Sequence, residues 1–309
     1  MATARFTTFE GTHKTDDGVE LYTKTWKVSG DAAKARMLFV HGFSDHCNNY
    51  PVFFEHLADL GIDVYAFDQR GWGRSVTKKH DRGLTGPTTR VLADITSMLH
   101  TLLPTPVPLF IMGHSMGGAE ILHYASTGPS EILSQIRGFI SSAPLIALHP
   151  STRPFRATVL AGRLAGRVLP KFQLVQKLEP KWLSRDPEQN KLWEQDELCH
   201  DTGTLEGLAG MLDRGIQLES FKVMPRDSAG EGGKIRLLAL HGTGDHVNDF
   251  AATKAYVEKS ELSDKELRTY DGWYHNMHAE PGDDKLMFAN HVSEWILSRL
   301  GPEDQKSKL

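Results

Sequence analysis

A serine flanked by glycines directly follows an apolar run, and this feature most limits what the chain can fold into. Residues 108–112 read Pro-Leu-Phe-Ile-Met, and residues 113–117 read Gly-His-Ser-Met-Gly. A Gly-x-Ser-x-Gly segment between a strand and a helix predicts a sharp turn, the nucleophile elbow, that exposes the serine hydroxyl at the strand end. Small residues at both ends permit a turn that bulky residues would block. Because any glycine-rich turn can match by chance, the interpretation of Ser115 as a nucleophile depends on partners elsewhere.

Apolar or β-branched runs alternate with helical patterns along most of the chain. The runs predict strands near residues 5–13, 20–28, 36–41, 62–67, 107–113, 136–142, 235–241 and 266–271. The first two are separated by Asp-Asp-Gly, a hairpin signal, whereas later runs are continuously apolar, as in strands covered on both faces. Helical patterns between them include Val52–Leu60, Thr88–Leu103 and Asp283–Leu300. The sequence therefore predicts an α/β fold with a mostly parallel eight-stranded sheet flanked by helices.

The alternation breaks between Pro144 and about Lys234. This stretch has helical periodicity and no convincing strand, and its chain breakers are Pro150, Pro154, Pro170, Pro180, Pro187 and Pro225. An insertion of this size between two strands predicts a helical cap, at about residues 145–230, over the carboxyl edge of the sheet. We therefore expect residues 1–309 to form a single α/β domain into which this cap is inserted.

A reactive serine needs a base that takes its proton and an acid that orients the base. Behind a nucleophile elbow, the acid and the histidine follow the serine in the chain. Residues 241–245 read His-Gly-Thr-Gly-Asp after one late predicted strand, and residues 271–275 read Asp-Gly-Trp-Tyr-His after the next. Both loops would open on the same sheet edge as the elbow. We expect Ser115 to be the nucleophile, His275 the general base and then acid, and Asp245 the orienting carboxylate.

Other residues compete for the acid and base positions. His278 lies farther past the strand end than His275, and Asp271 precedes the histidine in the same loop, where it cannot easily support it from behind. Asp249 is better placed to begin the following helix. His41 and His241 lie at strand ends, where a structural hydrogen bond is the default interpretation.

A transition state of acyl transfer also needs two backbone N–H donors for the developing oxyanion. We expect one to be the amide of Met116, which follows the nucleophile and opens the helix. The second should come from the loop after the strand near residues 36–41, which reads His-Gly-Phe-Ser-Asp-His over residues 41–46. Phe43 is the predicted second donor, although the glycine before it, Gly42, would also fit an ordinary turn.

Taken together, these motifs resemble the monoacylglycerol lipases of the α/β-hydrolase superfamily, especially the fungal and mammalian ones. The similarity spans about residues 14–300. The matching segments are Val40–His46, Asp68–Ser75, Gly113–Gly118, Ser142–Pro144 and Tyr274–His278. The resemblance implies an α/β-hydrolase fold, a Ser115–Asp245–His275 triad and an oxyanion hole at Phe43 and Met116.

The resemblance also implies which groups hold the alcohol part of the substrate. His114, Asp45 and His278 match positions where family members place polar groups near the alcohol, and Trp193 stands where mammalian enzymes have a tyrosine. Three positions depart from the mammalian pattern: Trp193 itself, Asn49 in place of an arginine, and Asn248 in place of a cysteine. Sensitivity to thiol reagents at that position is therefore not expected.

The predicted cap is strongly basic at its beginning. No Asp or Glu occurs from Ile132 to Leu178, and the basic residues there are Arg137, Arg153, Arg156, Arg163, Arg167, Lys171 and Lys177. Arg156, Arg163 and Arg167 can share one helical stripe, partly opposite Val159, Leu160, Leu164 and Val168. Such a helix favours docking on a membrane or lipid-droplet surface. Alternatively, its apolar side lines an acyl tunnel of the kind found in the family, and both interpretations can hold together.

Composition limits the remaining possibilities. A net charge of −4 gives no reason to expect a nucleic-acid partner, and the two cysteines, Cys47 and Cys199, form neither a disulfide framework nor a metal cluster. We predict no cofactor and no metal; the oligomeric state is left open. Residues 1–20 lack the apolar core of a signal peptide. Residues 307–309 read Ser-Lys-Leu, a peroxisomal address when C-terminal, so we expect an intracellular and peroxisomal protein, with cytoplasm, lipid droplet or membrane surface as alternatives.

These observations predict a serine hydrolase that cleaves monoacylglycerol to glycerol and a fatty acid through an acyl-enzyme. Other acyl esters are the first alternative: a lysophospholipid, a fatty acid ethyl ester, or an acyl thioester, although no dedicated basic pocket for the phosphates of coenzyme A is evident. A non-catalytic lipid-binding scaffold is a distant second alternative, because the chain offers every member of the triad.

Overall fold

A single large sheet organises the computed structural model, which describes residues 5–30 and 33–301. Its strand order is β1-β2-β4-β3-β5-β6-β9-β10. The strands are β1 Phe6–Lys14, β2 Glu20–Val28, β3 Ala35–Val40, β4 Ile62–Phe67, β5 Leu109–His114, β6 Gly138–Ser142, β9 Arg236–Gly242 and β10 Asp264–Tyr270. β2 pairs antiparallel with β1 and β4, and all the other neighbours in this sheet are parallel. The predicted eight-stranded, mostly parallel sheet is thus confirmed.

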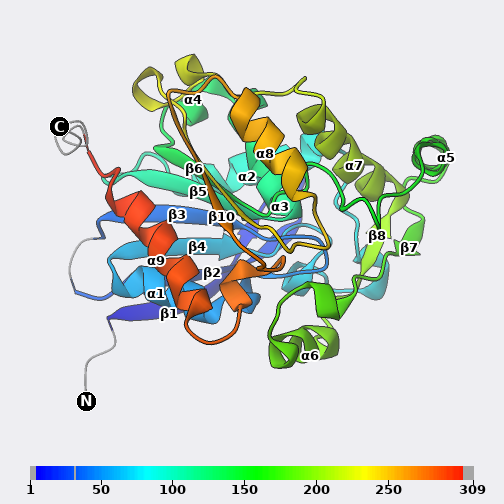
Figure 1. Cartoon of the computed structure of the whole chain (residues 1–309), viewed down its shortest axis with the longest axis horizontal. Coiled ribbons are helices and arrows are strands. Elements are labelled where there is room, and N and C mark those ends of the chain that lie inside the picture. Colours follow the sequence, from blue (N-terminus) through cyan, green and yellow to red (C-terminus); the bar gives the residue numbers. More distant parts are fainter. Residues whose placement is uncertain (1–4, 31–32, 302–309) are drawn as a thin grey trace.

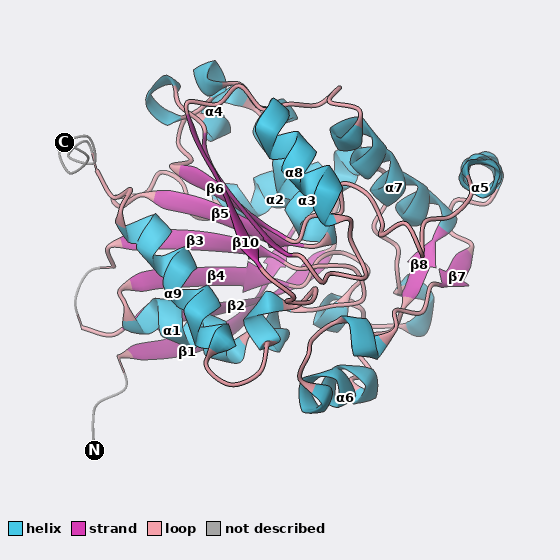
Figure 2. Ribbon diagram, in the orientation of Figure 1, coloured by secondary structure: helices cyan, strands magenta, loops and turns pink. Residues whose placement is uncertain are grey.

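Helices cover both faces of this sheet (Figures 1 and 2). The helices outside the cap are α1 Pro51–Asp59, α2 Thr88–His100, α3 Met116–Thr127, α4 Ser130–Leu133, α8 Phe250–Lys259 and α9 Asp284–Leu297. Residues of α1 and α9 share one buried apolar cluster with alternate residues of the strands, and residues of α2, α3 and α8 share the other. The central strands are therefore buried on both faces, which explains why their sequences are continuously apolar.

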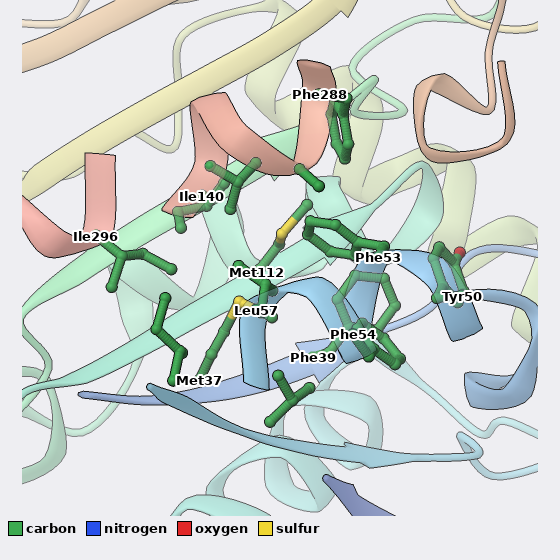
Figure 3. Packing of buried hydrophobic residues seen from close by; sticks show 14 of the residues in the cluster. Met37, Phe39, Tyr50, Phe53, Phe54, Leu57, Met112, Ile140, Phe288 and Ile296 are labelled. Carbon is green, nitrogen blue, oxygen red and sulfur yellow. The ribbon is translucent and has the colours of Figure 1, made fainter. Parts of the chain in front are cut away.

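The side chains of β3 show how the two clusters are separated. Met37 and Phe39 belong to the cluster under α1 and α9, whereas Leu38 and Val40 belong to the cluster under α2, α3 and α8. Figure 3 shows the first cluster, where Phe39 lies close to the rings of α1. Its ring centroid is 4.9 Å from that of Phe54. This alternation anchors the strand that leads directly into the predicted oxyanion loop.

Between β6 and β9 the chain forms a separate layer beyond the carboxyl ends of the parallel strands (Figure 1). Its elements are α5 Arg156–Val168, β7 Gln173–Val175, α6 Pro187–Gln195, β8 Thr202–Thr204 and α7 Leu205–Glu219. We call this layer the cap. The expectation that it holds no strand is wrong, because β7 and β8 pair antiparallel as a two-stranded sheet. Three-residue strands are too short to produce a recognisable period in the sequence.

Some features named in the sequence analysis cannot be examined in this structure. Residues 307–309 lie outside the described residues, and the side chain of Arg156 is likewise not described. Within residues 5–30 and 33–301, none of the helices combines the length and apolar character needed to cross a bilayer.

Candidate active site

Ser115 sits at the turn between β5 and α3, in a strained backbone conformation that close packing imposes. Its φ is +55° and its ψ is −115°, values that a non-glycine residue rarely adopts. A Cβ on Gly113 would lie 2.2 Å from the carbonyl oxygen of Gly117, and one on Gly117 would lie 2.2 Å from that of Val40. The turn therefore tolerates only glycine at these two positions, which is the physical meaning of the Gly-x-Ser-x-Gly pattern here.

Asp245 and His275 form a buried hydrogen-bonded pair after β9 and β10. His275 Nδ1 lies 2.7 Å from Asp245 Oδ2, and since the carboxylate accepts, Nδ1 donates and Nε2 is left as the basic nitrogen. The backbone N–H groups of Val247 and Asn248 donate to Asp245 Oδ1 at 2.7 and 3.0 Å. Burial opposes ionisation of Asp245, but the attraction of His275 and the hydrogen bond from His241 outweigh it and hold its pKa well below the usual value.

The hydroxyl of Ser115 is oriented by an amide in this structure. Asn248 Nδ2 donates to Ser115 Oγ at 3.4 Å, and among the described residues no hydrogen bond joins Ser115 Oγ to His275. The imidazole is nevertheless close, because the His275 ring centroid lies 4.8 Å from that of His114, the residue before the nucleophile. Catalytic hydrogen bonds are often long in unliganded enzymes and tighten with substrate. The Ser115–His275 contact thus stays a prediction that this neighbourhood supports.

Two backbone N–H groups are available at the predicted oxyanion hole. Met116 opens α3, so its N–H belongs to the first turn, which has no intrahelical acceptor. The loop after β3 packs against the nucleophile: a Cβ on Gly42 would lie 3.1 Å from Ser115 Cβ. Within the described part of the chain, the N–H groups of Met116 and Phe43 have no hydrogen-bond acceptor. They are therefore free to bind an oxyanion above Ser115.

The competing residues have other partners. The ring of His278 packs against that of Tyr50 at a tilt of 34°, with a centroid distance of 4.1 Å, and burial lowers the pKa of His278 to about 4. Asp271 is exposed and accepts from Thr243 Oγ1, while Asp249 caps α8 by accepting from the N–H of Ala251. None of the three is hydrogen-bonded to Ser115 or His275 within the described residues.

The two strand-end histidines behave differently from each other. His41 Nε2 accepts from the backbone N–H of Gln69 at 2.8 Å, which is the structural role predicted for it. His241 Nε2 instead donates to Asp245 Oδ2 at 3.1 Å, while its Nδ1 contacts Thr253 Oγ1 at 2.9 Å. His241 thus helps to fix the acid itself, which the sequence did not reveal.

An apolar cavity of about 330 Å³ opens directly over Ser115. Ser115, Phe43 and Asn248 form its floor, and residues of the cap form its walls, among them Val159 of α5 and, from α7, Leu205, Leu208, Met211 and Leu212. The volume is within the range of small-molecule sites in proteins. An acyl chain bound here would place its carbonyl carbon at the nucleophile.

Behind the nucleophile lies a buried polar cluster that contains three of the four predicted alcohol-binding residues. Asp45 accepts from Tyr50 Oη and, at 2.7 Å, from Asn49 Nδ2. The ring of His278 packs against that of Tyr50, and the centroid of the His114 ring lies 5.5 Å from that of His278. Burial opposes ionisation of Asp45, but the nearby imidazoles lower its pKa to about 2. The structure therefore brings these three side chains together.

This polar cluster does not line the cavity over Ser115. Burial lowers the pKa of His114 well below its usual value, and its Nε2 lies 3.0 Å from Asn276 Oδ1. Its Nδ1 is buried and has no hydrogen-bond partner in the described part of the chain. Trp193 is half-buried on α6, and no ring contact among the described residues joins it to the cluster. Contact of these four residues with the substrate alcohol stays a prediction.

One group of metal-ligand types gathers within the described residues: His46, Asp196 and Cys199. His46 Nδ1 accepts from the backbone N–H of Asn48 at 3.2 Å, so Nε2 carries the proton and donates to Asp196 Oδ2 at 2.8 Å. A metal on Nε2 would require the proton on Nδ1 and would break the contact with Asn48. The group is therefore explained as a hydrogen-bonded link between the cap and the sheet.

Asn248 is the other residue whose proximity to the reacting atoms the sequence did not reveal. In the sequence, Asn248 is notable only because it stands where the mammalian pattern has a cysteine. A polar residue three positions after the acid, in a loop at the carboxyl edge, was the available signal. Its contact with Ser115 depends on how the β9–α8 loop folds back, which no local pattern encodes.

Comparison with known proteins places this geometry among hydrolases. Residues 31–282 match the family model described as serine aminopeptidase, S33. The chain is 33% identical to the Schizosaccharomyces pombe protein named "Putative monoglyceride lipase", over 92% of this chain and 73% of that protein. It is 28% identical to the solved monoacylglycerol lipase of Paleococcus ferrophilus, with a TM-score of 0.76 over 91% of this chain and 99% of that one. The fold also matches a soluble variant of Saccharomyces cerevisiae monoglyceride lipase with a substrate analog, at a TM-score of 0.82 and 24% identity over 97% and 96% of the two chains.

Proposed function

We propose that this chain, which belongs to the serine aminopeptidase S33 family of α/β-hydrolases, is a serine hydrolase that cleaves monoacylglycerol to glycerol and a fatty acid. The observation that carries the proposal is the position of Ser115: on a strained elbow, beside the His275–Asp245 pair, at the floor of an apolar cavity. A peptide substrate fits this cavity less well than an acyl chain does, because most of the walls are aliphatic.

Acylation follows from the geometry of the site. Ser115 Oγ attacks the ester carbonyl carbon while His275 Nε2 takes the hydroxyl proton. Asp245 stabilises the imidazolium through the Nδ1 hydrogen bond of 2.7 Å. The N–H groups of Phe43 and Met116 bind the oxyanion of the tetrahedral intermediate. His275 then returns the proton to the departing glycerol oxygen, and the acyl group stays on Ser115.

Deacylation repeats the same steps with water. His275 takes a proton from a water molecule as that water attacks the acyl carbon, and the second tetrahedral intermediate collapses to the fatty acid. The proton returns to Ser115 Oγ. Each of these steps uses only water and the protein groups already described around Ser115.

A substrate panel tests the proposal most directly. Purified full-length protein is assayed for release of fatty acid from monoacylglycerols, lysophospholipids, fatty acid ethyl esters and acyl-coenzyme A, with Ser115→Ala as the blank. We expect monoacylglycerol to have a kcat/KM at least about tenfold above the others, because proteins named monoglyceride or monoacylglycerol lipase are among the relatives of this chain. Faster turnover of one of the other esters would mean that this ester, not monoacylglycerol, is the substrate. If no ester were turned over faster than by the blank, the proposal that the chain is a serine hydrolase would be refuted.

We propose in addition that the cap docks on lipid surfaces through α5. Large apolar side chains on this helix and directly beside it are exposed, namely Phe155, Leu160, Leu164, Val168 and Leu169. Exposed Arg167 and Lys171 lie nearby, and cations beside apolar side chains favour anionic lipid surfaces. Transfer of apolar side chains of this size from water to lipid is favourable, so their burial in a lipid surface would stabilise the docked state.

Vesicle sedimentation tests this docking. The double variant Leu160→Ser/Leu164→Ser should bind anionic phosphatidylglycerol vesicles at least about fivefold more weakly than the parent chain. Leu192→Ser removes an equally exposed leucine from α6 and serves as the matched control. Equal binding by all three proteins would contradict docking through α5.

The peroxisomal destination also stays a proposal, which the tripeptide at residues 307–309 supports. A fluorescent protein fused ahead of the chain should accumulate in peroxisomes, and deletion of the three residues should abolish that accumulation. Diffuse or lipid-droplet fluorescence of the intact fusion would favour the alternative locations.

A further inference from the structure

We propose that Asn248 is a catalytic residue whose side-chain N–H stabilises the negative charge that develops on Ser115 Oγ as the hydroxyl loses its proton. This inference rests on the proposed acyl-transfer function and adds a donor to it. Phe43 and Met116 serve the carbonyl oxygen of the substrate, whereas Asn248 serves the attacking oxygen.

The identity of the group that faces Ser115 is fixed by its second contact. Asn248 Nδ2 lies 2.7 Å from the carbonyl oxygen of Ala143 and 3.4 Å from Ser115 Oγ. A carbonyl oxygen only accepts, so the atom beside it must be the amide nitrogen. An amide nitrogen carries two hydrogens, and both contacts can therefore be made at once. The nucleophile faces a donor.

This donor is held rigidly. The side chain of Asn248 is fully buried, and its backbone N–H donates to Asp245 Oδ1 at 3.0 Å. An isolated antiparallel bridge joins Asn248 to Leu148 at the start of the cap. One residue thus contacts the nucleophile with its side chain and the acid with its backbone. Groups fixed in this way cost no reorganisation when charge develops.

The other side-chain atom of Asn248 indicates that the amide is not there for packing. Asn248 Oδ1 is buried and has no hydrogen-bond partner among the residues that the structure describes. An unsatisfied buried acceptor destabilises a fold, and an apolar side chain of similar shape would avoid that cost. The polar contacts that the amide makes are those of its nitrogen, with Ala143 and Ser115.

The contact strengthens along the reaction. In the resting site the N–H occupies a lone pair of Ser115 Oγ, which leaves the hydroxyl hydrogen free to point toward His275. As that proton moves to His275 Nε2 and the bond from Oγ to the acyl carbon forms, the partial charge on Oγ attracts the N–H more strongly. In the acyl-enzyme, Oγ is an ester oxygen and a weak acceptor. An interaction that is strongest in the transition state accelerates the step.

Two substitutions of Asn248 separate donation from packing. Asn248→Leu keeps the branching at Cγ without a donor, and Asn248→Asp keeps the shape but replaces the donor by a carboxyl group. Asp249→Asn, at the next position, retains an oxygen that can cap α8 and is the control for changes in the loop. Each full-length variant is checked for its thermal midpoint. The rate of acylation is then measured as the second-order rate of labelling of Ser115 by a fluorophosphonate and as the burst with a p-nitrophenyl ester, from pH 6 to 9.

We expect Asn248→Leu to acylate about tenfold more slowly, because the donor acts in the transition state. Asn248→Asp should be slower still at pH 8 to 9. Its deficit relative to the parent should narrow toward pH 6, since a buried carboxyl group that gains a proton also gains an O–H donor. Asp249→Asn should acylate at the parental rate.

Acylation of Asn248→Leu at the parental rate would overturn the proposal. The proposal would also be overturned if both variants lost acylation rate independently of pH and in proportion to their loss of folded protein. That pattern would mean that Asn248 only packs the site. The proposed function is tested separately, by assays of the parent chain alone. If fluorophosphonate labels Ser115 but monoacylglycerol is not hydrolysed, the substrate assignment fails and the role of Asn248 is still measured.

Discussion

Helices α3 and α5 both border the candidate site, yet they are packed in opposite ways. α3 begins beside the nucleophile, and ten of its 12 residues are buried. In α5, only Gly166 is buried among the residues whose exposure is described. Reacting groups must be held within fractions of an ångström, whereas a surface that admits lipid needs apolar area with few fixed contacts. The sheet with its covering helices is thus the rigid layer of the molecule, and the part of the cap formed by α5 is the loosely packed one.

The largest expected effect concerns the acid of the rigid layer. Asp245→Asn should lower kcat about 10⁴-fold, because the amide no longer stabilises the imidazolium or holds the productive tautomer. Asp271→Asn makes the same change at an exposed carboxylate nearby and should keep near-parental kcat. Initial rates with a soluble ester check both variants. A comparable loss in both would mean that the acid is assigned wrongly.

Matched glycines in the two helices should respond with opposite signs. Gly117→Ala in α3 would force a Cβ to 2.2 Å from the Val40 carbonyl oxygen, so we expect a loss of unfolding free energy of at least about 3 kcal/mol. At Gly162 in α5, no atom of the described residues lies within 4 Å of an added Cβ. Gly162→Ala should therefore stabilise by about 0.5–1 kcal/mol through helix propensity. Urea unfolding measures both changes. Equal changes in unfolding free energy would contradict the view that α3 is tightly packed and α5 is not.

Helix α7 forms one ion pair with α3 and one with α5, so the two helices can also be compared by the stability that each ion pair contributes. Arg214 Nη2 of α7 lies 2.9 Å from Glu120 Oε1 of α3, and both side chains are buried, whereas Asp213 pairs with the half-exposed Arg163 of α5. Arg214→Leu leaves a buried carboxylate unpaired and should cost about 3–5 kcal/mol of unfolding free energy. Arg163→Leu should cost less than about 1 kcal/mol. Thermal or urea denaturation distinguishes the two, and a cap pair as costly as the core pair would show that α5 is firmly anchored.

The smallest effect is a pH dependence located in the rigid layer. Burial lowers the pKa of His278 to about 4, below its value in the unfolded chain. Between about pH 6.5 and 4 the unfolded chain binds the extra proton, so stability falls as the pH falls through this window. His278→Gln should reduce the loss of unfolding free energy between pH 7 and 4.5 by about 2–3 kcal/mol. An unchanged difference would mean that His278 is not held in its neutral form.

The layers also differ in how well the sequence predicted them. The helix expected at Thr88–Leu103 spans Thr88–His100, and the strand expected near residues 62–67 spans Ile62–Phe67. Both belong to the sheet and its covering helices, where burial imposes a clear apolar pattern. In the cap, the pairing of β7 with β8 was missed, because its three-residue strands meet across 26 intervening residues. Contacts between segments that distant leave no periodic signal.

For the site, the sequence by itself determined which residue types stand at the ends of the strands. The run before Ser115, its flanking glycines, and the loops that carry Asp245 and His275 follow from local patterns, because strand length and turn chemistry are short-range properties. Only the tertiary structure decided that His241 supports the acid, that the polar cluster around Asp45 lies apart from the cavity, and that an amide faces the nucleophile. The contact between Asn248 and Ser115, for example, joins residues 133 positions apart, and its geometry is set by how whole elements pack.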